Sequence, residues 1–232
     1  MQPEATVMAQ APAHEDLARH PGFRCFKSVA SIRYPKRWYR TALIDAALDP
    51  AVMKMGPLLL PKSRLPQESE FSFWMSVNGV STLVVLSEGG CDIAALAARV
   101  PTKSVTRLAL QEEPTARLRR EIWSHQRAKV SIELIVLIVQ ETDNGFKDLT
   151  LRDVRLMAGK VCGDAGPSVY AAIVSGYLQV DIRQGWSPSV PVKLGPMAAR
   201  LLSPVDQERG LGVFNPSAGE PVAVRCTTDA HT

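Results

Sequence analysis

The clearest pattern in the chain is a change in the spacing of hydrophobic residues between positions 149 and 194. In the first half of this stretch, apolar residues recur three or four positions apart, which predicts two short amphipathic helices. In the second half, apolar and polar residues alternate, which predicts two half-buried strands. The apolar positions are Leu151, Val154, Met157, Val169, Ala172 and Ile173 in the helices, and Leu178, Val180, Ile182, Val190, Val192 and Leu194 in the strands.

Capping and turn residues mark the ends of these elements. Thr150 followed by Asp153 resembles a capping box, so the first helix is expected to begin there. Pro167 suits the first position of the second helix, because its missing N–H costs nothing there. Gly176 is expected to end that helix. The glycines between positions 159 and 166 predict the turn that joins the two helices.

The resulting order is helix, turn, helix, strand, wing and strand, which is that of a winged helix-turn-helix. Residues 183–189 form the predicted wing. An apolar helix over residues 131–140 is expected to complete the core of this domain.

Upstream, the pattern predicts a small α/β arrangement. Two strands are expected between residues 69 and 87, since apolar residues alternate there and Asn78-Gly79 is a strong hairpin signal. The fold class is therefore α+β. The expected parts are a disordered lead at 1–22, a small α/β domain at 23–128, a winged-helix domain at 129–196 and a Pro/Gly-rich tail at 197–232; the α/β domain is expected to hold helices at 41–48, 92–99 and 114–127 and a strand at 104–110.

Composition narrows the class of protein. The net charge is +4 and the pI about 9.0, a mildly basic balance that is compatible with nucleic-acid binding. The four cysteines are far apart and lack zinc-site spacing, so we expect free thiols in a reducing cytoplasm. No apolar run of about 18 residues suggests a membrane span, and the N-terminus lacks a signal-peptide pattern.

Residues 24–64 form a basic segment with nine Lys or Arg and only two acids, among which aromatic residues are interleaved. Cations supply salt-sensitive affinity for phosphates, and aromatic rings can stack on bases. A solvated basic face is the alternative interpretation. The candidate DNA contacts of this segment are Arg33, Lys36, Arg37 and Arg40.

The predicted winged helix offers a second set of candidates. Its expected recognition helix carries no Lys or Arg, and residues 130–200 hold seven basic and seven acidic side chains. A neutral domain of this kind binds either DNA or a protein, and the sequence leaves both open. The candidate DNA contacts are Ser168, Tyr170 and Ser175 facing outward from the helix, and Arg152, Arg155, Lys160, Arg183 and Lys193 around it.

Catalytic groups are sparse. Asp45 lies on the first predicted helix, Glu70 leads into the hairpin and Glu88 follows it, but no Lys stands two residues beyond an acid on that strand. Patterns for nucleophile elbows, phosphate loops or zinc proteases are absent. We therefore expect no catalytic residue, no metal and no cofactor.

Three stretches together resemble the TnsA-type transposon endonucleases. They are the basic segment and helix RYPKRWYRTALIDAALDPAV at 33–52, the hairpin SFWMSVNGVSTLVVLSEGG at 72–90, and the predicted winged helix ending in GYLQVDI. The resemblance implies a restriction-endonuclease-like N-terminal domain whose metal is held by an acid on the early helix, a Pro-Asp and a Lys. Asp45 stands near the first position, whereas residues 81–86 replace the Pro-Asp and no matching Lys follows.

The resemblance thus implies a copy that has lost cleavage and kept binding. We expect a cytoplasmic, DNA-associated accessory factor of a mobile element. Its partners are expected to be double-stranded DNA and, through the resemblance, a transposase or transposition ATPase. The alternatives are a divergent metal-dependent endonuclease, a winged-helix transcriptional regulator and a protein-interaction module.

Overall fold

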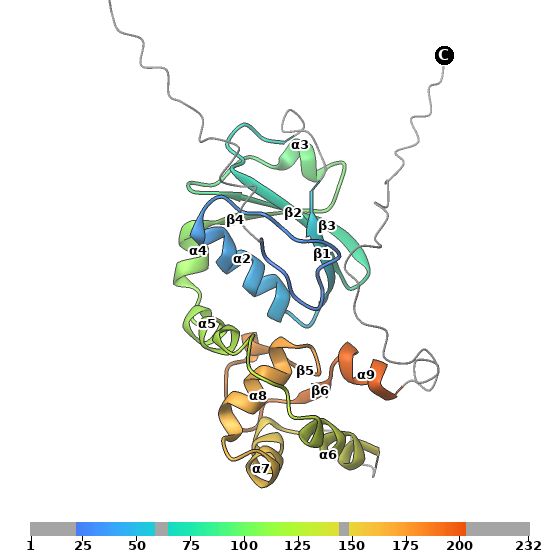
Figure 1. Ribbon diagram of the computed structural model, residues 1–232. Helices are drawn as coiled ribbons and strands as arrows, with labels where there is room; N and C mark the ends of the chain where they lie inside the picture. The colour runs from blue at the N-terminus through green and yellow to red at the C-terminus, as the bar shows by residue number, and fades with distance from the viewer. Residues whose placement is uncertain (1–21, 59–64, 144–148, 203–232) are drawn as a thin grey trace, which may run out of the picture.

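A computed structural model describes residues 22–58, 65–143 and 149–202 (Figure 1). Positions 1–21 of the predicted lead and 203–232 of the predicted tail lie outside the described residues. Within them, a four-stranded sheet with helix α2 forms one part of the molecule, and a group of helices with a two-stranded sheet forms the other (Figure 1). The fold is a mixed α+β arrangement, as expected.

The larger sheet has the strand order β1-β2-β3-β4. The hairpin predicted at Asn78-Gly79 is present, and both residues have positive φ, as a two-residue hairpin turn requires. β3 pairs antiparallel with β2 and parallel with β4, so the sheet is mixed. The strands are β1 (Val52–Pro57), β2 (Phe71–Val77), β3 (Val80–Ser87) and β4 (Thr102–Thr106).

Helix α2 (Arg37–Leu48) packs against this sheet and begins four residues before the predicted helix at 41–48. It buries Tyr39, Leu43 and Ile44. The short helix α3 (Ala94–Ala97) connects β3 to β4. Strand β1 was not predicted from the sequence. Its register shifts between Val52 and Lys54, so apolar and polar residues do not alternate along it, and it ends at Pro57.

The strand predicted at 104–110 is only partly correct. β4 ends at Thr106, whose side chain accepts a hydrogen bond from the backbone N–H of Ala109 at 3.2 Å. This cap starts helix α4 (Arg107–Glu112) inside the predicted strand. Helix α5 (Ala116–Ser124) follows and lies between the two parts of the molecule (Figure 1).

The C-terminal part has the predicted helices and two strands, but the strands are shorter than predicted: Ile182 lies in a 3-10 helix that extends into the predicted wing, and Val190 precedes the second strand. Strands β5 and β6 pair antiparallel, and Thr150 forms an isolated bridge with Pro191. The elements are α6 (Ile132–Asp143), α7 (Leu151–Val161), α8 (Ala165–Val174), β5 (Leu178–Val180), the 3-10 helix η2 (Ile182–Gln184), β6 (Val192–Leu194) and α9 (Pro196–Leu202).

Local signals at the ends of these helices were partly correct. Thr150 and Asp153 form the predicted capping box of α7, and Gly176 has the positive φ of 78° expected after a helix end. The start of α8 was wrong: Asp164 caps it by accepting from the N–H of Gly166 at 3.2 Å, which makes Pro167 its third residue.

Helix α9 overlaps the Pro/Gly-rich tail predicted at 197–232, so the start predicted for the tail was wrong. Ala198 is fully buried, and the N–H of Met197 donates to the carbonyl of Gly176 at 3.1 Å. These contacts fix the helix against the turn between α8 and β5.

The orientation predicted for α8 is correct on one face and wrong on the other. Val169 and Ile173 are buried as expected, but Tyr170 is only 8% exposed. The reason is that α5 covers the opposite face of α8, and the Tyr170 hydroxyl donates to Glu121 of α5 at 3.2 Å. Tyr170 is therefore withdrawn as a DNA-facing residue.

Aromatic contacts from the start of the described chain join the two parts. Phe23 stacks on Trp123 of α5 with ring centroids 4.9 Å apart. A Cβ added to Gly176 would meet the ring of Phe26 at 2.5 Å. One continuous buried core therefore includes residues of both parts.

Replacement of Ile173 by Ala is expected to lower the free energy of unfolding by about 2–5 kcal/mol, because the side chain is 4% exposed and its loss leaves a cavity. Val136→Ala on α6, at 48% exposure, is the matched control and is expected to change it by less than roughly 0.5 kcal/mol. Urea denaturation measures both. Equal losses in the two variants contradict the assigned burial.

Candidate functional site

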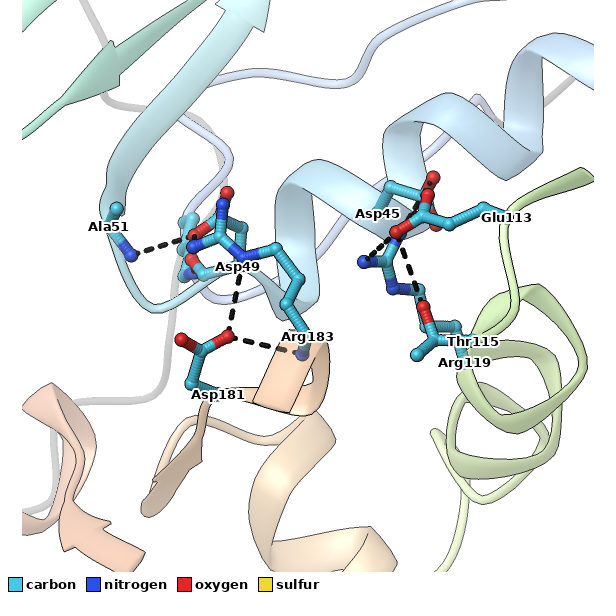
Figure 2. Close-up of polar contacts among 9 residues, drawn as sticks. Asp45, Asp49, Ala51, Glu113, Thr115, Arg119, Asp181 and Arg183 are labelled. Carbon is cyan, nitrogen blue, oxygen red and sulfur yellow. Dashed lines mark hydrogen bonds and ion pairs between the residues drawn. The ribbon is translucent and has the colours of Figure 1, made fainter. Parts of the chain in front are cut away.

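A pocket of about 210 Å³ lies between α2, the four-stranded sheet, helices α4 and α5, and η2. Its wall combines ionisable side chains with an apolar patch of the sheet. Figure 2 shows two networks of polar contacts beside the C-terminal half of α2, one around Asp45 and the other around Asp49. These networks connect the pocket to both parts of the molecule.

The buried guanidinium of Arg119 is the centre of the first network. It donates two hydrogen bonds to Glu113, at 2.6 and 2.8 Å, in the bidentate geometry that makes such pairs strong. A further ion pair of 3.0 Å joins it to Asp45. One side chain of α5 thereby ties α2 to the loop that precedes α5 (Figure 2).

Asp45 is held in an unusual electrostatic state. Burial raises the pKa of its carboxyl to about 6, although the neighbouring Arg119 guanidinium acts in the opposite direction. Its Oδ1 is buried and has no hydrogen-bond partner among the described residues. The carboxyl group therefore exchanges its proton close to neutral pH.

The second network joins the end of α2 to the C-terminal part. Asp49 accepts hydrogen bonds from Arg183 at 3.0 Å and from the N–H of Ala51 at 2.9 Å. Arg183 also donates to Asp181 at 3.2 Å (Figure 2). Although Arg183 was predicted to contact DNA, two carboxylates already neutralise its charge.

Lys27 is an unexpected member of this region. Its side chain is buried, and its Nζ donates to the backbone carbonyl of Asp49 at 2.5 Å. Burial lowers the pKa of the ammonium group to about 8, while the charges of Cys25 and Asp49 oppose that shift. Lys27 thus fixes the end of α2 instead of serving the basic surface.

Lys36 differs from the other candidate cations of the basic segment because it is paired with carboxylates. The Nζ of Lys36 lies 2.7 Å from Glu70 and 3.2 Å from Glu88, and the buried Tyr39 hydroxyl donates to Glu70. These contacts lower the pKa of Glu70. Glu70 and Glu88, which precede and follow the hairpin, are thus brought together around Lys36, and Arg107 lies 3.9 Å from Glu88.

The other candidates of this segment lie around the start of α2. Arg33 and Arg37 are exposed and Arg40 is half-buried. Within residues 22–58, 65–143 and 149–202, no ion pair involves any of these three arginines. They remain available to an anionic ligand.

The candidates of the C-terminal part are dispersed. Ser168 donates to the carbonyl of Asp164 at 2.8 Å, and Ser175 is the half-buried cap that ends α8. Arg155 lies over the ring of Trp186, 5.7 Å from its centroid. The exposed candidates are Arg152, Lys160, Lys193 and the ion-paired Arg183.

The sheet presents apolar side chains to Asp45. Phe73 and Met75 of β2 and Val84 of β3 line the pocket together with Lys103 of β4. Among the described residues, no group of three His, Cys, Asp or Glu side chains is placed to hold a metal ion. The thiols of Cys25, Cys91 and Cys162 are free.

Arg119 and Glu113 were missed as site residues. The helix predicted at 114–127 was given no site residue, yet Arg119 stands three residues after Ala116 and three before Ile122, both of which are buried. That helical spacing was the signal that distinguishes it from Arg117 and Arg120.

Comparison with known proteins gives no independent assignment: no protein family, curated protein or solved structure matches the chain. In the part of the chain that the structure describes, no helix is long and apolar enough to cross a membrane.

The raised pKa of Asp45 predicts a pH effect on stability. Because the folded state binds this proton more tightly than the unfolded state, the free energy of unfolding should fall as pH rises from about 4 to 6. Relative to Asp45→Asn, the wild type is expected to lose on the order of 1–3 kcal/mol over this range. Urea denaturation at a series of pH values measures the difference.

Asp153→Asn serves as the control, because the pKa of Asp153 is lowered and its effect on stability changes with pH in the opposite direction. Hydrogen bonds with Thr150 lower the pKa of Asp153, so its stabilising effect is lost as pH falls. Parallel pH profiles for the wild type and Asp45→Asn would contradict the raised pKa.

Proposed function

We propose that this protein binds duplex DNA without cleaving it, as an accessory factor related to the TnsA-type transposon endonucleases. The N-terminal part serves as a restriction-endonuclease-like core in which the nuclease site has degenerated. The C-terminal part serves as a winged helix. The observation that carries the non-cleaving assignment is the apolar wall of the pocket that Asp45 also lines.

Metal-assisted hydrolysis needs several oxygen ligands around the cation. Asp45 supplies one carboxylate from α2, in keeping with the acid that the resemblance places on the early helix. Phe73, Met75 and Val84 line the same pocket from the strands, and its other two carboxylates are engaged, Glu113 by Arg119 and Asp49 by Arg183. Arg119 also compensates the charge of Asp45. These features favour a core that has lost cleavage over the alternative of a divergent endonuclease.

Exposed cations support DNA association. Arg33 and Arg37 are exposed at the start of α2. Lys36 lies between them, but its ion pairs with Glu70 and Glu88 offset its positive charge. Cations without ion-pair partners are the groups that gain most from a phosphate, because no existing pair must be broken.

A second candidate function is a protein-interaction module. The observation that favours it is the burial of α8, the expected recognition helix, whose residues 169–174 are all buried. A helix that is buried over these residues leaves only its first turn, residues 165–168, for a DNA groove. The C-terminal part then meets a protein partner, for which the resemblance suggests a transposase or transposition ATPase.

The DNA-binding proposal is tested with the double variant Arg33→Ala/Arg37→Ala. It is expected to bind a fluorescein-labelled duplex more weakly than the wild type irrespective of sequence, with a salt dependence flattened by about one unit per lost phosphate contact. Fluorescence anisotropy at several salt concentrations measures both quantities.

Arg99→Ala/Arg200→Ala removes the same charge from exposed positions after α3 and on α9, and serves as the control. If both double variants weaken DNA binding equally, the binding depends on net charge alone and not on a site at the start of α2. Nicking of a supercoiled plasmid with Mg²⁺ or Mn²⁺, abolished by Asp45→Ala, would overturn the non-cleaving assignment.

A further inference from the structure

We propose that the bound duplex also contacts a second surface, formed by α5, the segment 125–129 and α7, on which arginines from the two parts of the molecule hold the phosphate backbone. This inference rests on the proposed DNA association. It assigns a role to α5 residues that belong to neither the pocket nor the segment at the start of α2.

Helix α5 divides its arginines between two functions. Arg119 points inward to the carboxylates of the pocket, whereas Arg117 and Arg120 are exposed. Arg127 and Lys129 are also exposed in the segment that follows α5. The helix therefore presents cations to solvent while Arg119 anchors it.

A cluster of aromatic side chains connects α5 to α7. His125, at the end of α5, lies 5.2 Å from the ring of Tyr170, which in turn lies 5.6 Å from Trp186. The guanidinium of Arg155 on α7 lies over the ring of Trp186, 5.7 Å from its centroid. This chain of contacts, from His125 through Tyr170 and Trp186 to Arg155, links α5 to α7.

Exposed arginines stand beyond both ends of this cluster. Arg117 precedes Glu121 by four residues and shares its helix face, and Glu121 accepts the hydrogen bond of Tyr170. Arg152 precedes Arg155 by three residues and shares its face on α7. A line of side chains thus runs from Arg117 through Tyr170 and Trp186 to Arg152.

The acids near this line are few and mostly engaged. Asp153 closes the capping box of α7, Asp164 caps α8, and Glu113 is paired with Arg119. Glu121 is exposed and bound to Tyr170. The cations outnumber these acids and are Arg117, Arg120, Arg127, Lys129, Arg152, Arg155 and Lys160.

The distribution of charge favours DNA over an acidic protein segment. The cations come from α5, from the segment that follows it and from α7, and charges spread over several segments suit the regularly spaced phosphates of a duplex backbone. Leu156 is exposed beside Arg152, and it would favour a protein ligand if it formed the centre of a larger apolar patch. Its neighbours one turn away on α7 are instead Arg152, Asp153, Gly159 and Lys160, none of which has a large apolar side chain.

The test uses Arg117→Ala/Arg152→Ala, which removes one exposed arginine from each end of the line. Relative to the wild type, affinity for the labelled duplex at low salt is expected to fall roughly tenfold, and the salt slope to decrease by about two units. Arg99→Ala/Arg200→Ala again serves as the control, and the variant Arg117→Lys/Arg152→Lys should retain most of the binding. Thermal unfolding of each variant verifies that the fold is intact.

The possible failures are distinguishable. If the wild type binds the duplex and Arg33→Ala/Arg37→Ala weakens it, but Arg117→Ala/Arg152→Ala binds like the control, this surface is wrong and the proposed function stands. If the wild type does not bind the duplex at low salt, both fall. If poly-L-glutamate competes as effectively as unlabelled duplex at equal charge, the surface binds acidic protein and the assignment to DNA is overturned.

Discussion

The buried guanidinium of Arg119 is the constraint on which the arrangement of the molecule depends. It compensates Asp45 on α2 and Glu113 before α5, and removing one member of such a buried set typically costs about 3–5 kcal/mol because a charge is left uncompensated. Arg119 holds α5 to α2, and α8 of the C-terminal part packs against both helices. The ion pair between Arg183 and Asp49 and the contact of Phe26 with Gly176 hold the same two parts together.

Elements specified by neighbouring residues were predictable from the sequence. The Asn78-Gly79 hairpin and the Thr150 capping box are set by side chains within a few positions, and both are present. Elements specified by distant partners were not. Tyr170 is turned inward by Glu121, 49 positions away, and α9 is held by the turn at Gly176, so no local pattern announces either.

The candidate site illustrates the same division. Sequence analysis identified Asp45 and the cations around α2, because residue type and local charge are visible in the chain. It did not identify which cations are already engaged. Lys36 and Arg183 resemble free phosphate ligands until the fold brings Glu70, Glu88 and Asp49 against them. Burial and ion pairing, more than the count of basic residues, decide which surface is left for a partner.

The contact between Gly176 and Phe26 has a consequence for how such a chain can change over evolutionary time. The glycine combines a left-handed backbone with a position where any side chain would enter the ring of Phe26. Another C-terminal part could therefore replace this one beside Phe26 only if it also carried a glycine at this turn, since the ring leaves no room for a side chain. Recombination that brought any other residue to this turn would place its Cβ against the ring of Phe26 and strain the left-handed backbone.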